Sequence, residues 1–302
     1  MRAGLRTAAA EHGVVARSRT TDFLELTKPR ITLMVVATTF VGFYLGLKGK
    51  VPLALFCHTL LGTALVASGA SAFNMYFERH LDGLMRRTNE RPLPAGRVQP
   101  VEAIAFALFI TVAGVLYLFV CVNHLTSLVA AVTFVGYLFL YTPLKRRTWL
   151  CTLVGAVPGA LPAAMGWTAI TGRLSWDAWI LFAIVFFWQL PHFYAIGWMY
   201  REDYARAGFP MLAVVDSNGS RTSRQTNLYI VLLVLVTVVP SAIGLAGLVY
   251  LAGALMLGAL FLARGFQFAR LRDAVSAKRL FLASVCYLPI LLTLLVVDKA
   301  AP

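Results

Sequence analysis

Long, almost uncharged apolar segments recur along nearly the whole chain, and they constrain its fold more than any other feature. The hydrocarbon core of a bilayer is about 30 Å thick, and an α-helix needs about 20 mainly apolar residues to cross it. The segments are continuously apolar rather than alternating, which argues against a transmembrane β-barrel. Only 13% of the 302 residues are charged, whereas a soluble domain has about 25%. We therefore predict an all-α, polytopic membrane protein.

The apolar segments divide into nine predicted membrane-spanning helices. Their ranges are 30–48, 52–78, 100–120, 124–142, 149–170, 176–200, 226–246, 248–268 and 279–297. Only a short Gly-rich turn separates the seventh helix from the eighth. We predict one transmembrane domain over residues 29–302, preceded by a tail at residues 1–28.

The positions of Lys and Arg predict the orientation, because loops on the cytoplasmic side carry an excess of both. With nine spans, 23 of the 27 Lys and Arg fall in the N-terminal tail and the loops on its side of the membrane, and four on the other side. An eight- or ten-helix division would break this pattern. We predict a cytoplasmic N-terminus and an outside C-terminus, and the net charge of +14 then indicates topology rather than nucleic-acid binding.

The cysteines and the N-terminal tail exclude some other features. Cys57, Cys121, Cys151 and Cys286 lie in four different apolar segments without a CxxC pair, so we expect neither a disulfide nor a zinc site. The tail 1–28 has no apolar core of a signal peptide. A bacterial cytoplasmic tail is a simpler interpretation than a mitochondrial transit peptide.

Three oxygen-bearing side chains, Asn74, Glu78 and Asp82, follow one another at four-residue spacing where the second predicted helix ends. This spacing keeps them near one helix face, because each step drifts only about 40°. Hard oxygen ligands of this kind suit Mg²⁺, and arginines suit phosphate groups. Three arginines follow directly: Arg86, Arg87 and Arg91. Ionisable residues at the edge of a membrane-spanning bundle are candidates for a functional site.

A second acidic segment, residues 191–216, resembles the first in kind: aromatic residues at a helix end, then acids, an arginine and Gly-Pro turns. Its acids are Glu202, Asp203 and Asp216. Two such segments facing each other could hold Mg²⁺ between carboxylates and a diphosphate. The alternative is that each acid is a solvated charge at a helix end.

Two segments also carry a resemblance to a known family. The first is N-x-x-x-E-x-x-x-D-x-x-M-x-R-T-x-x-R-P-L-P, from Asn74 to Pro94, and the second joins W-x-x-P-H-F-Y-A to R-x-D-Y-x-x-A-G-x-P-M-L, from Trp188 to Leu212. The chain resembles the UbiA-type intramembrane prenyltransferases over nearly its whole length after residue 20. The R-T-x-x-R-P-L-P and P-H-F segments resemble the branch that farnesylates haem b.

The resemblance implies a UbiA-type helix bundle, an enzyme of the bacterial inner membrane with its active site on the cytoplasmic side, and transfer of a farnesyl group from farnesyl diphosphate to a vinyl of haem b. The products would be haem O and diphosphate, with Mg²⁺ as cofactor. Its implied catalytic metal ligands are Asn74, Glu78, Asp82 and Asp203. The chain has Glu78 where many relatives have Asp, and Ala207 where a second Asp is usual, so Glu202 or Asp216 could supplement Asp203.

The resemblance also implies substrate-binding residues, namely Arg86, Arg87, Arg91, Lys145, Arg201, Tyr200, His192 and Tyr141. Candidates for an aromatic chamber around the farnesyl cation are Phe73, Tyr76, Phe77, Tyr137, Tyr141, Phe193 and Tyr200. The propionates of haem need further arginines, and Arg86, Arg146 and Arg147 remain unranked. His80 is a weaker candidate contact than His192.

The expected partners are the two substrates, the lipid bilayer and a haem A synthase, with no nucleic acid. Two alternatives stay open at this point. One is a UbiA-type enzyme that prenylates a quinone precursor or chlorophyllide. The other is a membrane transporter, which should place polar residues near the bilayer midplane rather than at one end of its helices.

Overall fold

The structure is a computed structural model that describes residues 18–300. Within that range the regular structure is helical, apart from an isolated β-bridge between Ala246 and Lys299. Nine helices of the described chain are long and apolar enough to cross a membrane, which confirms the predicted number. They span Pro29–Gly46, Leu53–Asp82, Pro100–Cys121, His124–Leu144, Cys151–Thr171, Trp176–Met199, Ser220–Ala242, Leu248–Leu271 and Ala274–Val297.

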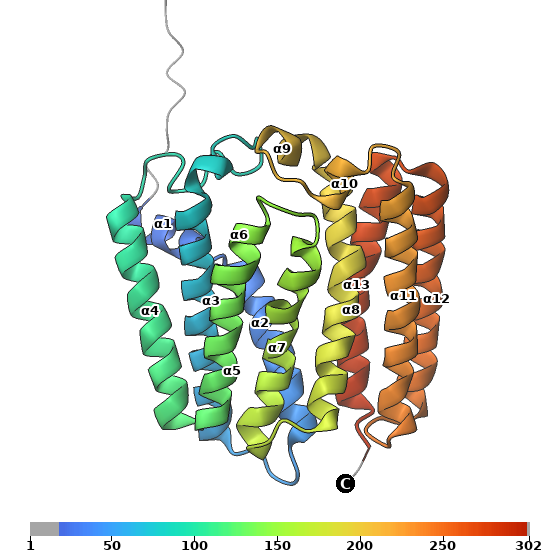
Figure 1. Cartoon of the computed structure of the whole chain (residues 1–302). Helices are drawn as coiled ribbons and strands as arrows, with labels where there is room; N and C mark the ends of the chain where they lie inside the picture. The colour runs from blue at the N-terminus through green and yellow to red at the C-terminus, as the bar shows by residue number, and fades with distance from the viewer. Residues whose placement is uncertain (1–17, 301–302) are drawn as a thin grey trace, which may run out of the picture.

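The long helices stand side by side in one bundle (Figure 1). In chain order they are α2 (Pro29–Gly46), α3 (Leu53–Asp82), α4 (Pro100–Cys121), α5 (His124–Val135) with its continuation to α6 (Thr142–Leu144), α7 (Cys151–Thr171), α8 (Trp176–Met199), α11 (Ser220–Ala242), α12 (Leu248–Leu271) and α13 (Ala274–Val297). Two short helices, α9 (Arg201–Arg206) and α10 (Leu212–Val215), cover one end, and the C-terminus lies at the other. We call the end that carries α9 the polar end.

Several helices run further than the apolar segments from which they were predicted. Helix α3 continues to Asp82 instead of ending at residue 78, and α11 and α13 begin at Ser220 and Ala274 instead of residues 226 and 279. The added turns are polar, so an apolar-segment criterion leaves them out, although the backbone stays helical. The extension of α3 matters most, because it makes Asn74, Glu78 and Asp82 parts of one continuous helix.

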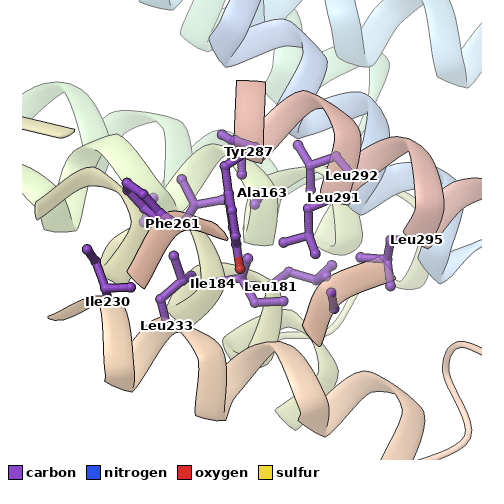
Figure 2. Close-up of a cluster of buried hydrophobic side chains, with 14 of the residues drawn as sticks. Ala163, Leu181, Ile184, Ile230, Leu233, Phe261, Tyr287, Leu291, Leu292 and Leu295 are labelled. Carbon is purple, nitrogen blue, oxygen red and sulfur yellow. The ribbon is translucent and has the colours of Figure 1, made fainter. Parts of the chain in front are cut away.

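Small residues let α2 and α7 approach closely in the middle of the bundle. A Cβ atom added to Gly42 would lie 1.9 Å from the Ala163 carbonyl oxygen, and one added to Gly166 would lie 1.9 Å from the Thr39 carbonyl oxygen. Glycine is required at such contacts because membrane helices associate through close backbone packing rather than through the hydrophobic effect. The largest apolar cluster lies beside this contact, where Ile184, Leu233, Phe261, Tyr287 and Leu291 pack together (Figure 2).

A π-helical segment, Gly136–Tyr141, interrupts the span that begins with α5. Such segments are rare in proteins, but those that occur often lie at functional sites. The extra residue in the turn rotates the side chains that follow it. Here Tyr141 is the last residue of the π-helical segment, and Lys145 follows it. A Cβ atom on Gly155 of α7 would lie 2.5 Å from the Tyr141 ring, so α7 leaves space for this ring only because residue 155 is glycine.

The described part of the predicted tail is not a free extension. Residues Arg19–Leu26 form α1, which begins where the Ser18 hydroxyl accepts from the Thr21 N–H. Leu26 is fully buried against α3 and the loop that follows it. Arg97 donates from Nε to Asp22 Oδ1 over 2.7 Å and from Nη2 to Glu25 Oε2 over 3.3 Å. Residues 1–17 of the predicted tail lie outside the described residues.

Candidate active site

The three residues of the first motif lie at the polar end of α3, with 2% of Asn74, 5% of Glu78 and 1% of Asp82 exposed. A carboxylate is stable in such a place only when it is paired and hydrogen-bonded. Glu78 and Asp82 each meet this condition, and like the amide of Asn74 each is contacted by a basic side chain from a different part of the chain.

The contacts are direct. Lys28 Nζ donates to Asn74 Oδ1 over 2.7 Å. Lys145 Nζ donates to both oxygens of Glu78, over 2.8 and 3.0 Å, and Arg91 Nη1 donates to Asp82 Oδ2 over 2.7 Å. We call these six residues the acid–cation cluster. It concentrates charge of both signs where a polar substrate could enter the bundle.

Lys28 is a member of the cluster that the sequence did not single out. It precedes Pro29 at the start of α2, and its backbone is left-handed, with φ 47° and ψ 66°. That conformation costs a residue with a Cβ atom roughly 1–2 kcal/mol, and such strain is found mainly at functional sites. Burial, together with the charge of Arg91, lowers the pKa of Lys28 from 10.5 to about 7. The Lys-Pro step was the only local signal, and it does not reveal a contact with Asn74.

Lys145 was predicted as a substrate contact and lies within the cluster. Burial alone would disfavour its ammonium, but the Glu78 carboxylate and the surrounding tyrosines raise the Lys145 pKa well above its usual range. The ammonium lies 5.2 Å from the ring centres of Tyr141 and Phe209. The Tyr141 ring in turn lies 5.4 Å from that of Tyr137. Two of the predicted chamber aromatics therefore flank the acid–cation cluster.

The chemistry of the cluster fits a divalent cation. Two of its polar atoms, Asp82 Oδ1 and Asn74 Nδ2, are buried and have no hydrogen-bond partner among the described residues. An unpaired carboxylate oxygen can serve as a ligand for a cation, and the Lys145 ammonium on Glu78 shows that this carboxylate attracts positive charge. Within residues 18–300, no three His, Cys, Asp or Glu side chains come together as a closed metal cage. Mg²⁺ does not need one, because it usually takes one or two carboxylates with substrate phosphates and waters.

The second motif lies on α9, at the same end of the bundle. Asp203 is mostly buried and forms an ion pair with Arg206. No hydrogen bond or ion pair joins Asp203 to Asn74, Glu78 or Asp82 within the described residues, so its role as a fourth metal ligand stays a prediction. The motifs meet instead through an apolar cluster of Met85, Cys151, Ala207, Phe209 and Met211.

Two supplementary acids differ in their surroundings. Both Asp216 contacts use Oδ2, which accepts from Thr222 N over 2.6 Å and from Thr222 Oγ1 over 2.7 Å. Asp216 thereby accepts a hydrogen bond from a backbone N–H in the first turn of α11, a capping role that carboxylates often have. Glu202 is exposed and lines a pocket with Arg86 and Arg201.

Other predicted contacts are spread more widely. The Arg87 guanidinium lies 5.2 Å from the Tyr200 ring centre, which links the two motif loops. His192 Nδ1 lies 2.7 Å from Ser284 Oγ of α13 and its ring stacks on Trp188, so the residue packs between α8 and α13. The remaining aromatic candidates differ in exposure. Phe73 is buried, Tyr76 is half-buried, and Phe77 and Phe193 are exposed on the bundle surface. The basic candidates Arg146, Arg147 and His80 are exposed at the polar end.

Comparison with known proteins identifies relatives of this chain. Residues 35–288 match the UbiA prenyltransferase family. A protein of Solibacter usitatus named protoheme IX farnesyltransferase is 45% identical over 287 residues, which cover 92% of this chain and 98% of that protein. A protein of the same name from Salinibacter ruber is 45% identical over 277 residues, covering 92% and 98%.

Solved structures share the fold at low identity. A digeranylgeranylglyceryl phosphate synthase superposes with a TM-score of 0.78 at 16% identity, over 92% of this chain and 98% of that one. A UbiA homologue from Archaeoglobus fulgidus, described as bound to GPP and Mg²⁺, superposes with a TM-score of 0.63 at 14% identity, over 91% of this chain and 99% of that one. The helix bundle, with a buried acid–cation cluster at one end, is that of an intramembrane prenyltransferase. The chain belongs to the UbiA prenyltransferase family, and it is an enzyme.

Proposed function

We propose that this enzyme transfers the farnesyl group of farnesyl diphosphate to a vinyl of haem b, releasing diphosphate and forming haem O for terminal oxidases. The acid–cation cluster carries the proposal, because it can hold a diphosphate at the edge of an apolar bundle. Support for the haem acceptor comes from relatives named protoheme IX farnesyltransferase that are 45% identical over 92% of the chain.

Mg²⁺ would be held by Asp82, through its unpaired oxygen, by Glu78 and by Asn74, with Asp203 as a proposed further ligand. Bound there, Mg²⁺ would neutralise the charge that grows on the diphosphate as the allylic C–O bond breaks.

The basic residues of the cluster would bind and orient the diphosphate. Lys28, Lys145 and Arg91 already converge on the three motif side chains from separate segments. The charges of Lys145 and Arg91 are held in place before the substrate arrives, and preorganised charge stabilises a developing anion more than mobile water does. Arg87, which stacks on Tyr200, would add charge at the entrance.

The aromatic residues would protect the farnesyl cation. Tyr137 and Tyr141 present ring faces close to Lys145, at the boundary between the charged cluster and the apolar helices. Ring faces attract cations, and a packed aromatic wall excludes water until the vinyl group has attacked. The farnesyl chain would extend between helices toward the lipid. Water then adds to the cation on the haem side, which gives a hydroxyethylfarnesyl group.

The enzyme is a multi-pass membrane protein, and we place it in the bacterial inner membrane with the polar end in the cytoplasm. The described loops on the side of α9 carry most of the Lys and Arg, as the positive-inside rule requires of cytoplasmic loops. Haem b and farnesyl diphosphate would both reach the cluster from that side. A haem A synthase is a proposed recipient of the product.

The function is tested by product analysis. Membranes containing the chain are incubated with haem b, farnesyl diphosphate and Mg²⁺. The extracted haems are separated by chromatography, and their masses are measured by mass spectrometry. We expect a haem with the added hydroxyethylfarnesyl mass, which disappears when EDTA is present. Release of diphosphate with a quinone precursor, and no new haem, would instead favour the alternative acceptor class.

A further inference from the structure

A pocket of 270 Å³ opens at the polar end, between three segments that are far apart in the sequence. The loop after α3 contributes Arg86, the segment from Trp198 to Arg206 contributes the end of α8 and most of α9, and the turn between α12 and α13 contributes Arg272–Ala274. We call it the arginine pocket, after Arg86, Arg201, Arg206 and Arg272. Asn74, Glu78 and Asp82 do not line it, so it is distinct from the acid–cation cluster, although Asp203, proposed above as a further metal ligand, does line it.

Three of these four arginines have no carboxylate partner among residues 18–300. Arg206 pairs with Asp203. The Arg201 guanidinium instead lies 4.8 Å from the centre of the Trp198 ring system. Within the described part of the chain, the Arg272 side chain donates only to main-chain oxygens, those of Ala269 over 3.0 Å and Asn218 over 3.3 Å. Arg86 has no hydrogen bond or ion pair to any residue between 18 and 300.

The acids of the pocket do not cancel these charges fully. Asp203 belongs to Arg206, and Asp273 accepts from the Ser276 N–H over 2.7 Å at the start of α13. Asp273 is thereby committed to capping a helix, where the helix dipole also favours a negative charge. Among the acids that line the pocket, Glu202 is then the one without a hydrogen bond or ion pair to another residue between 18 and 300, and three of the lining guanidinium groups have no carboxylate partner in that range.

The backbone at Arg272 gives an independent reason to see function here. Arg272 follows the last residue of α12 with φ 50° and ψ 34°, a left-handed position at which helices usually have glycine. A non-glycine residue kept in this conformation at a pocket is a typical sign of a functional constraint. The strained position places an arginine in the lining of the pocket, where no ion pair joins it to any acid of the described residues.

We propose that the arginine pocket binds the carboxylates of the prenyl acceptor, which in haem b are the two propionates. This inference rests on the proposed function, because it takes a tetrapyrrole as the acceptor. Guanidinium groups bind carboxylates through paired, planar hydrogen bonds. The volume is below the range of about 300–1,000 Å³ that is typical of sites for whole small molecules. It therefore suits the anionic edge of the acceptor and leaves the vinyl-bearing edge free to face the bundle.

The test compares the binding of haem b with that of its dimethyl ester, which lacks the carboxylate charges, to the purified full chain in detergent. The variant is Arg272→Gly combined with Arg86→Gln. Glycine accepts the left-handed backbone at residue 272, so this change keeps the backbone conformation of the turn while it removes a cation and its hydrogen bonds to the Ala269 and Asn218 carbonyl oxygens. We expect the dissociation constant for haem b to rise roughly tenfold or more, as for loss of charged hydrogen bonds. That for the ester should stay the same.

Arg270→Gln is the matched control, because Arg270 is exposed in the same segment and does not line the pocket. It should leave both dissociation constants unchanged, and none of the variants should change the KM for farnesyl diphosphate.

Equal affinity of wild type and double variant for haem b would overturn the inference. The inference would also be wrong if the double variant lost as much affinity for the dimethyl ester as for haem b. A lipid headgroup offers similar chemistry. If the variant kept its affinity for haem b but lost enrichment of phosphatidylglycerol in mixed phosphatidylglycerol–phosphatidylcholine nanodiscs, the pocket would be a lipid site and the inference would be wrong. Failure of the wild type to bind either haem would contradict the proposed function itself.

Discussion

At the scale of single residues, the site depends on buried oxygen atoms that face cations from elsewhere in the chain. Asp82 illustrates this best, because one carboxylate oxygen is held by Arg91 while the other has no partner among the described residues. An unpaired buried acceptor is costly in a folded protein. The unpaired oxygen of Asp82 has a physical reason if a bound ligand supplies its missing partner.

Replacement of Asp82 by Ala should reduce product formation at least about 100-fold, the usual effect of removing one preorganised electrostatic contact. The variant should still insert and accumulate in membranes, because the surrounding apolar cluster is unchanged. The measurement is haem product per amount of membrane protein. Glu90→Ala, which removes an exposed acid of the same loop, is the control and should retain wild-type activity. Normal turnover by Asp82→Ala would rule out the metal-site proposal.

Lys28 supplies a prediction that separates charge from backbone. Lys28→Met and Lys28→Arg both keep a Cβ atom at the left-handed position, but only Met removes the positive charge. We expect Lys28→Met to raise the KM for farnesyl diphosphate roughly tenfold, from the loss of one charge-assisted hydrogen bond, and Lys28→Arg to raise it less. Steady-state kinetics over a range of farnesyl diphosphate concentrations provides the comparison. Identical KM values for both variants would mean that Lys28 acts only on the fold.

At the scale of the elements, α1 connects the surface of the bundle to its site. Lys28 follows α1 directly, and α1 is fixed by Arg97, which contacts Asp22, Glu25 and the Glu90 carbonyl oxygen. Asp22 is only 3% exposed, so loss of Arg97 would leave a buried charge without its strongest partner.

Arg97→Ala should therefore lower the free energy of unfolding by about 1–3 kcal/mol and increase hydrogen exchange in residues 19–26. The control is Arg19→Ala, which breaks the ion pair of Arg19 with Glu102 on the surface. Because 70% of the Arg19 side chain is exposed, this change should lower the free energy of unfolding much less than Arg97→Ala does. Thermal unfolding in detergent and hydrogen exchange measure the two effects. Equal responses of both variants would show that Arg97 does not anchor α1.

At the scale of the whole molecule, nine spans place the two ends of the described chain on opposite sides of the bundle (Figure 1). The distribution of Lys and Arg predicts that the polar end is cytoplasmic. Alkaline phosphatase fused to the C-terminus should then be active, whereas green fluorescent protein at the same place should not fluoresce. A fluorescent fusion would contradict the predicted orientation and move the proposed site to the outer side.

Much of this architecture could be predicted from the sequence, because the bilayer restricts what an apolar segment of about 20 residues can do. The nine spans follow from that restriction, and four-residue spacing along a helix places Asn74, Glu78 and Asp82 together. The helix ends were less accurate, as at Ser220 and Ala274, because polar turns beyond the apolar segment carry no hydropathy signal.

The sequence by itself therefore determined the class of fold, the number of spans, the family motifs and the candidate acids. The tertiary structure decided which cation meets which acid. Lys28 and Asn74 are 46 positions apart, and Lys145 and Glu78 are 67 apart, so no local pattern could pair them. The same holds for the arginine pocket, which joins Arg86 to Arg272 across the bundle. Periodicity reports which face of a helix a residue occupies, whereas packing alone sets which helices bring their faces together.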